Sequence, residues 1–162
     1  MTHCVRAEIL TPEKFKPFGR LIEVPSGKAD VERDYLRWWG GLYDLDFQDT
    51  ASIGYLEIQR REFLVSELER HVKAAEIFIS IEGVSIMPFA PASASDNPEA
   101  RPSLDKLTAF IVDGTQGMII ERGVWHFPPF PVTQKMGFIL IVRKETADDL
   151  DIKPCTATSI FL

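Results

Sequence analysis

The chain has 162 residues, of which 45% are hydrophobic and 26% are charged, and its formal net charge is −6 at pH 7. This length and composition are typical of one globular domain, predicted here to span residues 1–162. The acidic balance argues against a nucleic-acid partner, because affinity for phosphate backbones comes from clustered Lys and Arg. No apolar run approaches the roughly 20 residues that a membrane helix needs, so a membrane partner is not expected.

The chain start and the cysteines bear on the compartment. The first six residues lack the apolar core of a signal peptide. Cys4 and Cys155 match neither a CxxC zinc pattern nor a disulfide framework. We therefore expect a cytoplasmic protein.

Short apolar segments alternate with turn residues along the chain, a pattern typical of an all-β fold. Residues 5–9 alternate first, and Thr11 and Pro12 then open a short helix as N-cap and first helical residue, with Gly19 expected to end it. Further strands are predicted at residues 20–24, 54–59, 63–69, 77–81, 85–89, 107–112, 118–121 and 136–143. Residues 66–70 are also compatible with a helix by propensity.

The segment at residues 91–104 contains three prolines and few apolar residues, which predicts a mobile loop rather than a domain linker. Many short strands without long helices leave a sandwich or a barrel as the architecture. A double-sheet barrel of the jelly-roll kind closes most strand edges at this length. We therefore predict an all-β jelly-roll barrel.

A convergent polar site is predicted from residues 69–83 and 122–128. Glu69, His71, Glu76 and Gly83 have the spacing at which a small antiparallel barrel places metal ligands on neighbouring strands, and His126 comes from a later strand. Imidazole and carboxylate suit a divalent transition metal or general acid/base chemistry. We predict metal ligands at His71, Glu76 and His126, and catalytic roles for these three and for Glu69.

These residues also have plainer structural interpretations, which the sequence leaves open. His71 and His126 are alternatively core histidines bonded to backbone carbonyls, and Glu69 and Glu76 alternatively face solvent. The adjacent Trp38 and Trp39 are either core aromatics at a glycine bend or, as we slightly prefer, a dimer contact.

Substrate contacts are predicted for residues that flank the candidate ligands, namely Arg70, Arg122, Trp125 and Phe127. An Arg guanidinium is suited to a substrate carboxylate because its planar fork matches two oxygens. Trp125 would be a pocket wall and a core residue at once. Arg70 should point away from His71, because neighbours in a strand face opposite sides.

The same residues resemble a known family. Glu69-x-His71-x4-Glu76-x6-Gly83 resembles the first cupin motif with Glu69 replacing its first His, and Gly117, Gly123 and His126 resemble the second. The chain is more closely similar to the ureidoglycolate lyases of purine and allantoin degradation. The segments that carry this similarity are residues 10–19, 67–71, 114–117 and 123–128.

This resemblance implies a cupin-type double-stranded β-helix with a short N-terminal helix, assembled as a homodimer. It implies an enzyme that splits ureidoglycolate, a small-molecule substrate, into glyoxylate and urea. A base would take the hydroxyl proton and an acid would assist the leaving nitrogen. A divalent Ni, Mn, Zn or Fe ion would lower the pKa of the hydroxyl, and no organic cofactor is expected.

The chain departs from the family pattern at several positions. Glu76 stands where members commonly have Gln, which strengthens the metal interpretation. The positions that lack a common polar residue of the family are Ile119, Phe127, Gly137 and Val142. An alternative is therefore a diverged cupin that binds another small ligand, either without catalysis or as a metal-dependent isomerase or dioxygenase.

Overall fold

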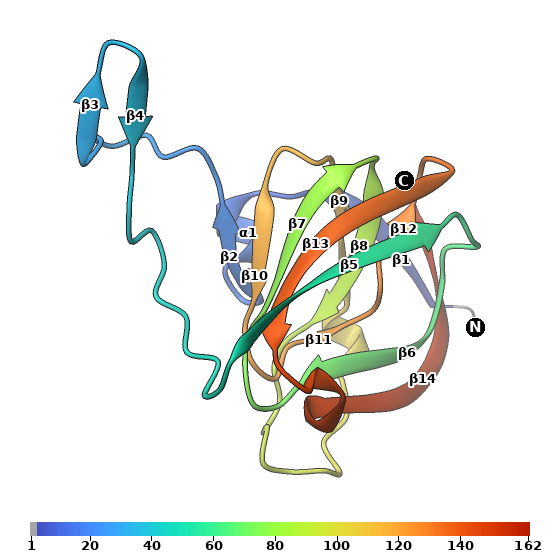
Figure 1. Ribbon diagram of the computed structural model, residues 1–162. Coiled ribbons are helices and arrows are strands. Elements are labelled where there is room, and N and C mark those ends of the chain that lie inside the picture. The colour runs from blue at the N-terminus through green and yellow to red at the C-terminus, as the bar shows by residue number, and fades with distance from the viewer. Residues whose placement is uncertain (1–2) are drawn as a thin grey trace.

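The computed structural model describes residues 3–162, and strands dominate its regular structure (Figure 1). The elements follow along the chain as β1 (His3–Ile9), α1 (Pro12–Phe15), β2 (Gly19–Ile22), β3 (Val31–Arg33), β4 (Leu36–Trp38), β5 (Ala51–Gln59), β6 (Leu64–His71), β7 (Glu76–Glu82), β8 (Ser85–Ala90), η1 (Leu104–Lys106), β9 (Thr108–Val112), β10 (Gly117–Ile120), β11 (Trp125–His126), β12 (Phe130–Pro131), β13 (Lys135–Arg143), η2 (Thr146–Asp149) and β14 (Leu150–Phe161). No helix within this described part has the length and apolar character needed to cross a bilayer.

Two sheets form the body of the protein. Across residues 3–162, the larger sheet has seven strands in the order β11-β6-β14-β1-β9-β8-β12, and the smaller has five in the order β2-β10-β7-β13-β5. Strand β11 pairs with both β6 and β8, so the larger sheet closes on itself as a barrel does. The predicted all-β jelly-roll barrel with a short N-terminal helix is confirmed.

Two clusters of buried apolar side chains lie on either side of β11. The first gathers residues of α1, the smaller sheet and strands β8 and β9, and its aromatic members are Phe15, Phe18, Phe78, Phe89, Phe110 and Phe138. The second comes from the larger sheet and its connections, and its largest members are Leu68, Ile86, Trp125 and Phe130. Because neighbours in a strand point to opposite faces, Trp125 joins the second cluster while His126 contacts Phe78 and Phe89 of the first.

Most predicted elements are found, with differences that have clear physical causes. Thr11 caps α1 as predicted, its hydroxyl accepting from Lys14 N at 3.3 Å, but the helix ends at Phe15, before Gly19. The helical alternative for residues 66–70 is wrong, because β6 pairs with β14 and with β11. Strand β14 was not predicted, since charges at Asp151 and Lys153 and the following Pro154 interrupt its apolar pattern.

Gly19 is needed for a close approach of two strands. A Cβ built there would lie 1.8 Å from the Ile119 carbonyl oxygen on the paired strand β10. We expect Gly19→Ala to lower the free energy of unfolding by about 2–3 kcal/mol, because β2 must move away from β10. Urea unfolding measures this, with Gly27→Ala as the control, since no described heavy atom lies within 4 Å of a Cβ at Gly27. Equal stability of the two variants would contradict the expectation.

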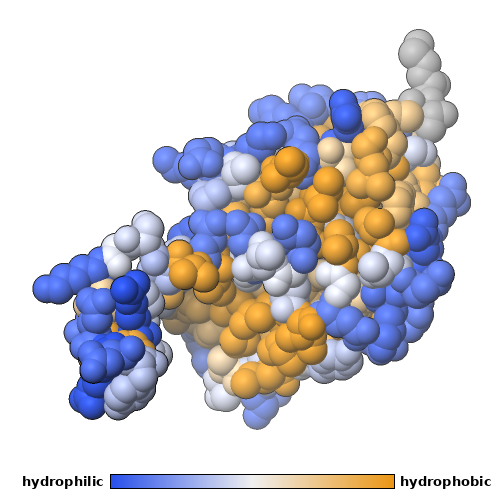
Figure 2. Space-filling view, turned by 90° about the horizontal axis from the view of Figure 1, so that it is seen from above, coloured by the Kyte–Doolittle hydropathy of each residue, from blue (hydrophilic) through white to orange (hydrophobic). Residues whose placement is uncertain are grey.

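The hairpin of β3 and β4 stands clear of the barrel as an arm (Figure 1). Seen from above, the arm is a separate, largely hydrophilic projection beside a more apolar barrel surface (Figure 2). Trp38 on the arm is 59% exposed, whereas Trp39 is half-buried and donates from Nε1 to the Gly27 carbonyl at 3.0 Å. The two tryptophans therefore have different environments, and neither belongs to the two core clusters.

Candidate functional site

Three predicted residues converge where the two sheets meet. His71 ends β6 in the larger sheet, Glu76 opens β7 in the smaller sheet after a short turn, and His126 lies in β11. Glu76 Oε2 lies 3.4 Å from His71 Nε2 and 3.3 Å from His126 Nε2. One ligand atom from each residue falls within 4.8 Å of the other two. The structure thus brings the sequence-predicted triad to a single point.

His126 presents one ring nitrogen to this point. Its Nδ1 lies 3.1 Å from the carbonyl oxygen of Val124, an interaction that places the ring proton on Nδ1. The Nε2 atom is fully buried and makes no hydrogen bond of ordinary geometry with the described residues. Phe78 and Phe89 pack against the ring, each with a centroid distance of 6.4 Å. This buried Nε2 therefore faces the Glu76 carboxyl group, 3.3 Å from Oε2.

His71 is held from its other side by residues that the sequence did not single out. Its Nδ1 lies 3.1 Å from the Thr146 hydroxyl and 3.9 Å from Asp149 Oδ2. Both residues belong to η2, a short 3-10 helix that precedes β14. They follow Lys144 and Glu145 in a polar segment, where nothing in the sequence distinguishes a buried acid from the exposed ones around it.

Glu69 borders the triad from strand β6. It pairs directly with His126 across the strands, and its Oε1 lies 3.7 Å from His126 Nε2. Its side chain keeps 22% exposure, whereas that of Glu76 keeps 9%. Glu69 is therefore the more accessible of the two carboxyl groups.

The two carboxyl groups differ in their proton affinity. Burial alone would raise the pKa of Glu76, but its close polar contacts with His126 and His71, and their charge, lower that pKa to about 2. Burial raises the pKa of Glu69, with the negative charge of Glu76 adding to the effect. Burial disfavours protonation of His71, yet the hydrogen bond and charge of Glu76 raise its pKa. A pair of carboxyl groups pushed in opposite directions is suited to act as a base and an acid.

The donor set also fits a divalent transition metal. Two imidazole nitrogens and one carboxylate oxygen are ligands that such ions accept, with open positions left for a substrate. The buried Nε2 of His126 lacks a donor, as an uncoordinated ligand atom would. His71, Glu76 and His126 are therefore able to hold such an ion.

Comparison with known proteins agrees with this geometry. The family model described as "Ureidoglycolate lyase" matches residues 2–159. The chain belongs to the ureidoglycolate lyase family.

Individual relatives extend over most of both sequences. A protein named ureidoglycolate lyase from Pseudomonas syringae pv. syringae (strain B728a) is 27% identical over 150 residues, covering 89% of this chain and 85% of the relative. Another of that name from Escherichia coli O9:H4 (strain HS) is 28% identical over 156 residues, covering 89% of each. A solved structure of RmlC from Streptococcus suis in complex with dTDP-D-xylose has a TM-score of 0.41 and 10% identity, and the match spans 58% of this chain and 44% of that one.

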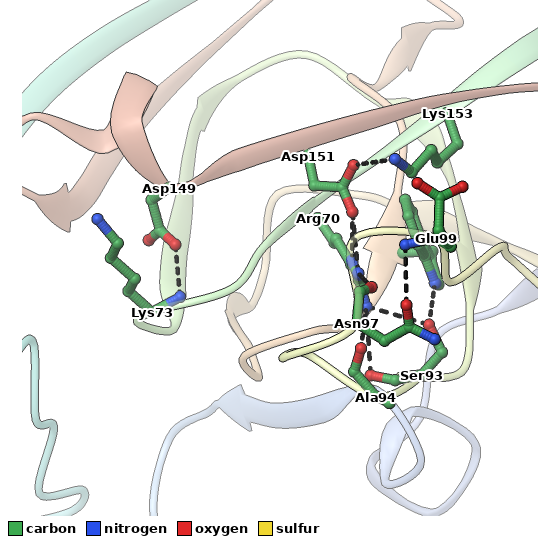
Figure 3. A network of polar contacts seen from close by, with 10 residues as sticks. Arg70, Lys73, Ser93, Ala94, Asn97, Glu99, Asp149, Asp151 and Lys153 are labelled. Atoms are coloured by element: carbon green, nitrogen blue, oxygen red, sulfur yellow. Dashed lines mark hydrogen bonds and ion pairs between the residues drawn. The ribbon is translucent and has the colours of Figure 1, made fainter.

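Arg70, expected at the substrate of a ureidoglycolate lyase, is fully buried among other partners. Its Nε and Nη2 each lie 2.9 Å from Asp151 Oδ2, and its guanidinium lies 4.5 Å from the Trp125 ring centroid. The remaining donors reach the segment at residues 91–104 (Figure 3), through the carbonyl oxygens of Ser93, Ala94 and Asn97 and the Ser93 hydroxyl. The structure therefore ties this segment to β6 and β14, although the sequence predicted it to be mobile.

Trp125 and Phe127 lie on the face of β11 away from the triad. Trp125 is fully buried and donates from Nε1 to the Ser93 hydroxyl at 2.9 Å. Phe127 packs against the Phe130 ring at 5.5 Å and lies under the Arg61 guanidinium. Trp125 belongs to the second apolar cluster and Phe127 packs against that cluster, rather than against the group around Glu76.

Arg122 is exposed on the turn that leads to β11. It lines a surface hollow of about 320 Å³ together with Arg20 and Lys73. The turn at residues 72–75, which joins His71 to Glu76, borders the same hollow, and Gly123 N donates to the His71 carbonyl at 2.7 Å. Of the four residues expected to contact substrate in this lyase family, Arg122 alone is exposed and has no described partner for its charge.

Proposed function

We propose that this protein is a ureidoglycolate lyase that cleaves ureidoglycolate into glyoxylate and urea in allantoin and purine degradation. The family match across residues 2–159 carries the proposal. The convergence of Glu69, His71, Glu76 and His126 supports it, because such a cleavage needs a base and an acid at one point. This family membership favours the lyase over a non-catalytic cupin.

The proposed reaction needs one proton removed and one proton supplied. Glu76, ionised at neutral pH, accepts the proton of the substrate hydroxyl as the carbonyl of glyoxylate forms. The carbon–nitrogen bond breaks, and Glu69, whose pKa is raised by burial, donates a proton to the departing urea nitrogen. His71 and His126 hold the Glu76 carboxylate between their Nε2 atoms. Protons balance over the cycle once Glu76 returns its proton to Glu69 through solvent.

His71, Glu76 and His126 would hold a divalent ion such as Ni, Mn, Zn or Fe. When bound, this ion would supply Lewis-acid polarisation of the substrate hydroxyl. The orphaned Nε2 of His126 in an apolar wall of Phe78 and Phe89 supports this assignment. In that case Glu76 is a ligand, and the proton passes to Glu69 on the accessible side of the site.

Arg122 is proposed to bind the substrate carboxylate. It is exposed at the hollow bordered by the turn that joins His71 to Glu76. Lys73 and Arg20 also line this hollow, together with three acidic residues, Asp44, Asp46 and Glu121, the last of which pairs with Arg20. A guanidinium without a described acidic partner retains its donors for a carboxylate. Arg70, Trp125 and Phe127 are proposed to support the site indirectly, by positioning the residues beside them that face the substrate.

The protein is proposed to be a cytoplasmic homodimer of single-domain chains, as the family resemblance implies. The exposed Trp38 and Tyr35 on the arm, and Ile53 and Tyr55 on the edge strand β5, are apolar surface available for such a contact. Light scattering is expected to give twice the 18.3 kDa mass of one chain. A mass of one chain would remove the dimer from the proposal.

Release of urea and glyoxylate from ureidoglycolate tests the function directly. The assay uses protein as purified, protein stripped with a chelator, and stripped protein reloaded with single divalent ions. Equal release of both products establishes the lyase, and loss on stripping with recovery on reloading assigns the triad to a metal. Full activity after verified removal of metal would assign Glu76 to proton transfer alone. Folded protein without release in any arm would favour a diverged cupin with another ligand.

A further inference from the structure

We infer that Thr146 and Asp149 are positioning residues that fix the ring of His71, so that its Nε2 faces Glu76 and His126. This inference rests on the proposed function of the triad. It concerns a segment that neither the motifs nor the family match assigns to the site.

The ring of His71 is held between polar groups on both sides. Nε2 lies 3.4 Å from Glu76 Oε2, and Nδ1 lies 3.1 Å from Thr146 Oγ1 and 3.9 Å from Asp149 Oδ2. A flipped ring would present carbon atoms to both Thr146 and Glu76 and would lose both contacts. Thr146 Oγ1 and the Asp149 carboxyl group are both able to accept from Nδ1, and a proton held there leaves Nε2 free to ligate an ion at the triad.

Asp149 is unusual because its carboxylate is nearly inaccessible, with 1% exposure. Its Oδ1 accepts a hydrogen bond from the backbone nitrogen of Lys73, while Oδ2 has no hydrogen-bond partner among the described residues. A buried charge without a partner is costly, so it persists only where a nearby positive or donating group compensates it. The His71 ring offers such a group to Oδ2, with Nδ1 3.9 Å away.

The backbone holds η2 against the turn that follows His71. Val72 N donates to the Asp149 carbonyl at 3.1 Å, directly before the Lys73 amide that donates to the Asp149 side chain. Leu150, the next residue, pairs with His71 in the larger sheet. Glu145 enters η2 with a φ of 60°, a left-handed conformation that is unfavourable for a residue with a side chain. Surrounding contacts therefore enforce a strained turn that delivers Thr146 and Asp149 to the ring.

The parallel with His126 supports a positioning role. The Nδ1 of His126 is fixed by a backbone carbonyl, and that of His71 by a side-chain pair. In both cases Nε2 is the atom aimed at Glu76. Partners behind a ligating histidine commonly change metal affinity about 10–100-fold when removed.

Histidine tautomers give a test that does not depend on turnover. Nitrogen-15 NMR of the full-length protein, recorded at alkaline pH where the rings are neutral, is expected to show His71 protonated on Nδ1. His71→Gln assigns the signal. Thr146→Val and Asp149→Asn are expected to shift it toward a mixture of tautomers, and the amide introduced by Asp149→Asn keeps an oxygen that can accept from Lys73 N. Thr146→Ser, which keeps the hydroxyl, should retain the wild-type signal.

Zn²⁺ affinity, measured by calorimetry on stripped protein, gives a second readout. Thr146→Val and Asp149→Asn should each bind Zn²⁺ about 10–100-fold more weakly than wild type. Asp148→Asn is the matched control, because Asp148 is the exposed acidic neighbour in the same 3-10 helix. A wild-type ring protonated on Nε2, or variants that leave both the tautomer and the Zn²⁺ affinity unchanged, would overturn the inference. If wild type binds no Zn²⁺ but the tautomer changes as expected, the metal proposal fails and the positioning role stands.

Discussion

Glu76→Gln is expected to reduce ureidoglycolate cleavage by about two to four orders of magnitude in kcat, the range that a general base contributes. The replacement keeps the shape of the side chain but removes its charge. At neutral pH the carboxylate is ionised, because its pKa is about 2. A neutral amide neither accepts the hydroxyl proton nor provides a charged ligand between the Nε2 atoms of His71 and His126. Both proposed roles of Glu76 therefore predict the same loss of turnover.

Glu82→Gln provides the matched control for this substitution. Glu82 ends the same strand β7 and is exposed, with its carboxylate 3.5 Å from Lys135 Nζ at the surface. Its replacement should leave kcat within about twofold, since exposed ion pairs contribute little. Zn²⁺ titration of the two variants then separates the roles of Glu76, because weaker binding by Glu76→Gln alone identifies a ligand. Glu76→Gln protein that is folded and retains wild-type kcat would refute both roles.

The sequence predicted those parts of the fold in which local pattern and tertiary environment agree. Residues 77–81 and 136–143 alternate or run apolar, and both form paired strands of the smaller sheet. Strand β14 was not predicted because its charged residues break the apolar pattern, and the buried partner of Asp151, which is Arg70, is supplied only by the tertiary structure. The arm hairpin was likewise missed, since its side chains are exposed and give no burial pattern.

In the candidate site too, residues in a local motif were predicted from the sequence, whereas residues that depend on tertiary contacts were not. His71, Glu76 and His126 were predicted because motif spacing fixes where a strand delivers a ligand, and the structure brings their polar atoms together. Thr146 and Asp149 were missed, since they reach His71 from 75 and 78 positions further along the chain, through a turn with no motif. The hydrogen-bond partners of Arg70 could not be predicted from the sequence either, because these acceptors lie 23 to 81 positions away along the chain. The alternation of side chains along a strand correctly predicted that Arg70 points away from His71. It could not predict which residues the Arg70 side chain contacts.

Arg70→Met is expected to lower the free energy of unfolding by about 3–5 kcal/mol, because several polar groups lose a buried donor at a cost of about 1–3 kcal/mol each. Methionine fills much of the same volume but donates no hydrogen bond. Asp151 would lose its buried partner, and the carbonyl oxygens of Ser93, Ala94 and Asn97 would lose their donor. Urea unfolding measures the loss. Faster hydrogen exchange of the amides at residues 91–104 should accompany it, since this guanidinium holds the segment against the barrel.

Arg101→Met is the matched control, because Arg101 is an exposed arginine of the same segment. It should change stability by less than about 0.5 kcal/mol.

The pair of variants also separates the two roles assigned to Arg70. If the Arg70 guanidinium fixes the segment at residues 91–104, Arg70→Met should lose much stability. Its KM should then change only if the substitution displaces β11 and Trp125. A guanidinium that binds the substrate carboxylate predicts the reverse, a raised KM in a protein as stable as Arg101→Met. The second outcome would require the Arg70 side chain to exchange its protein acceptors for substrate, because all three of its nitrogens are engaged in the structure.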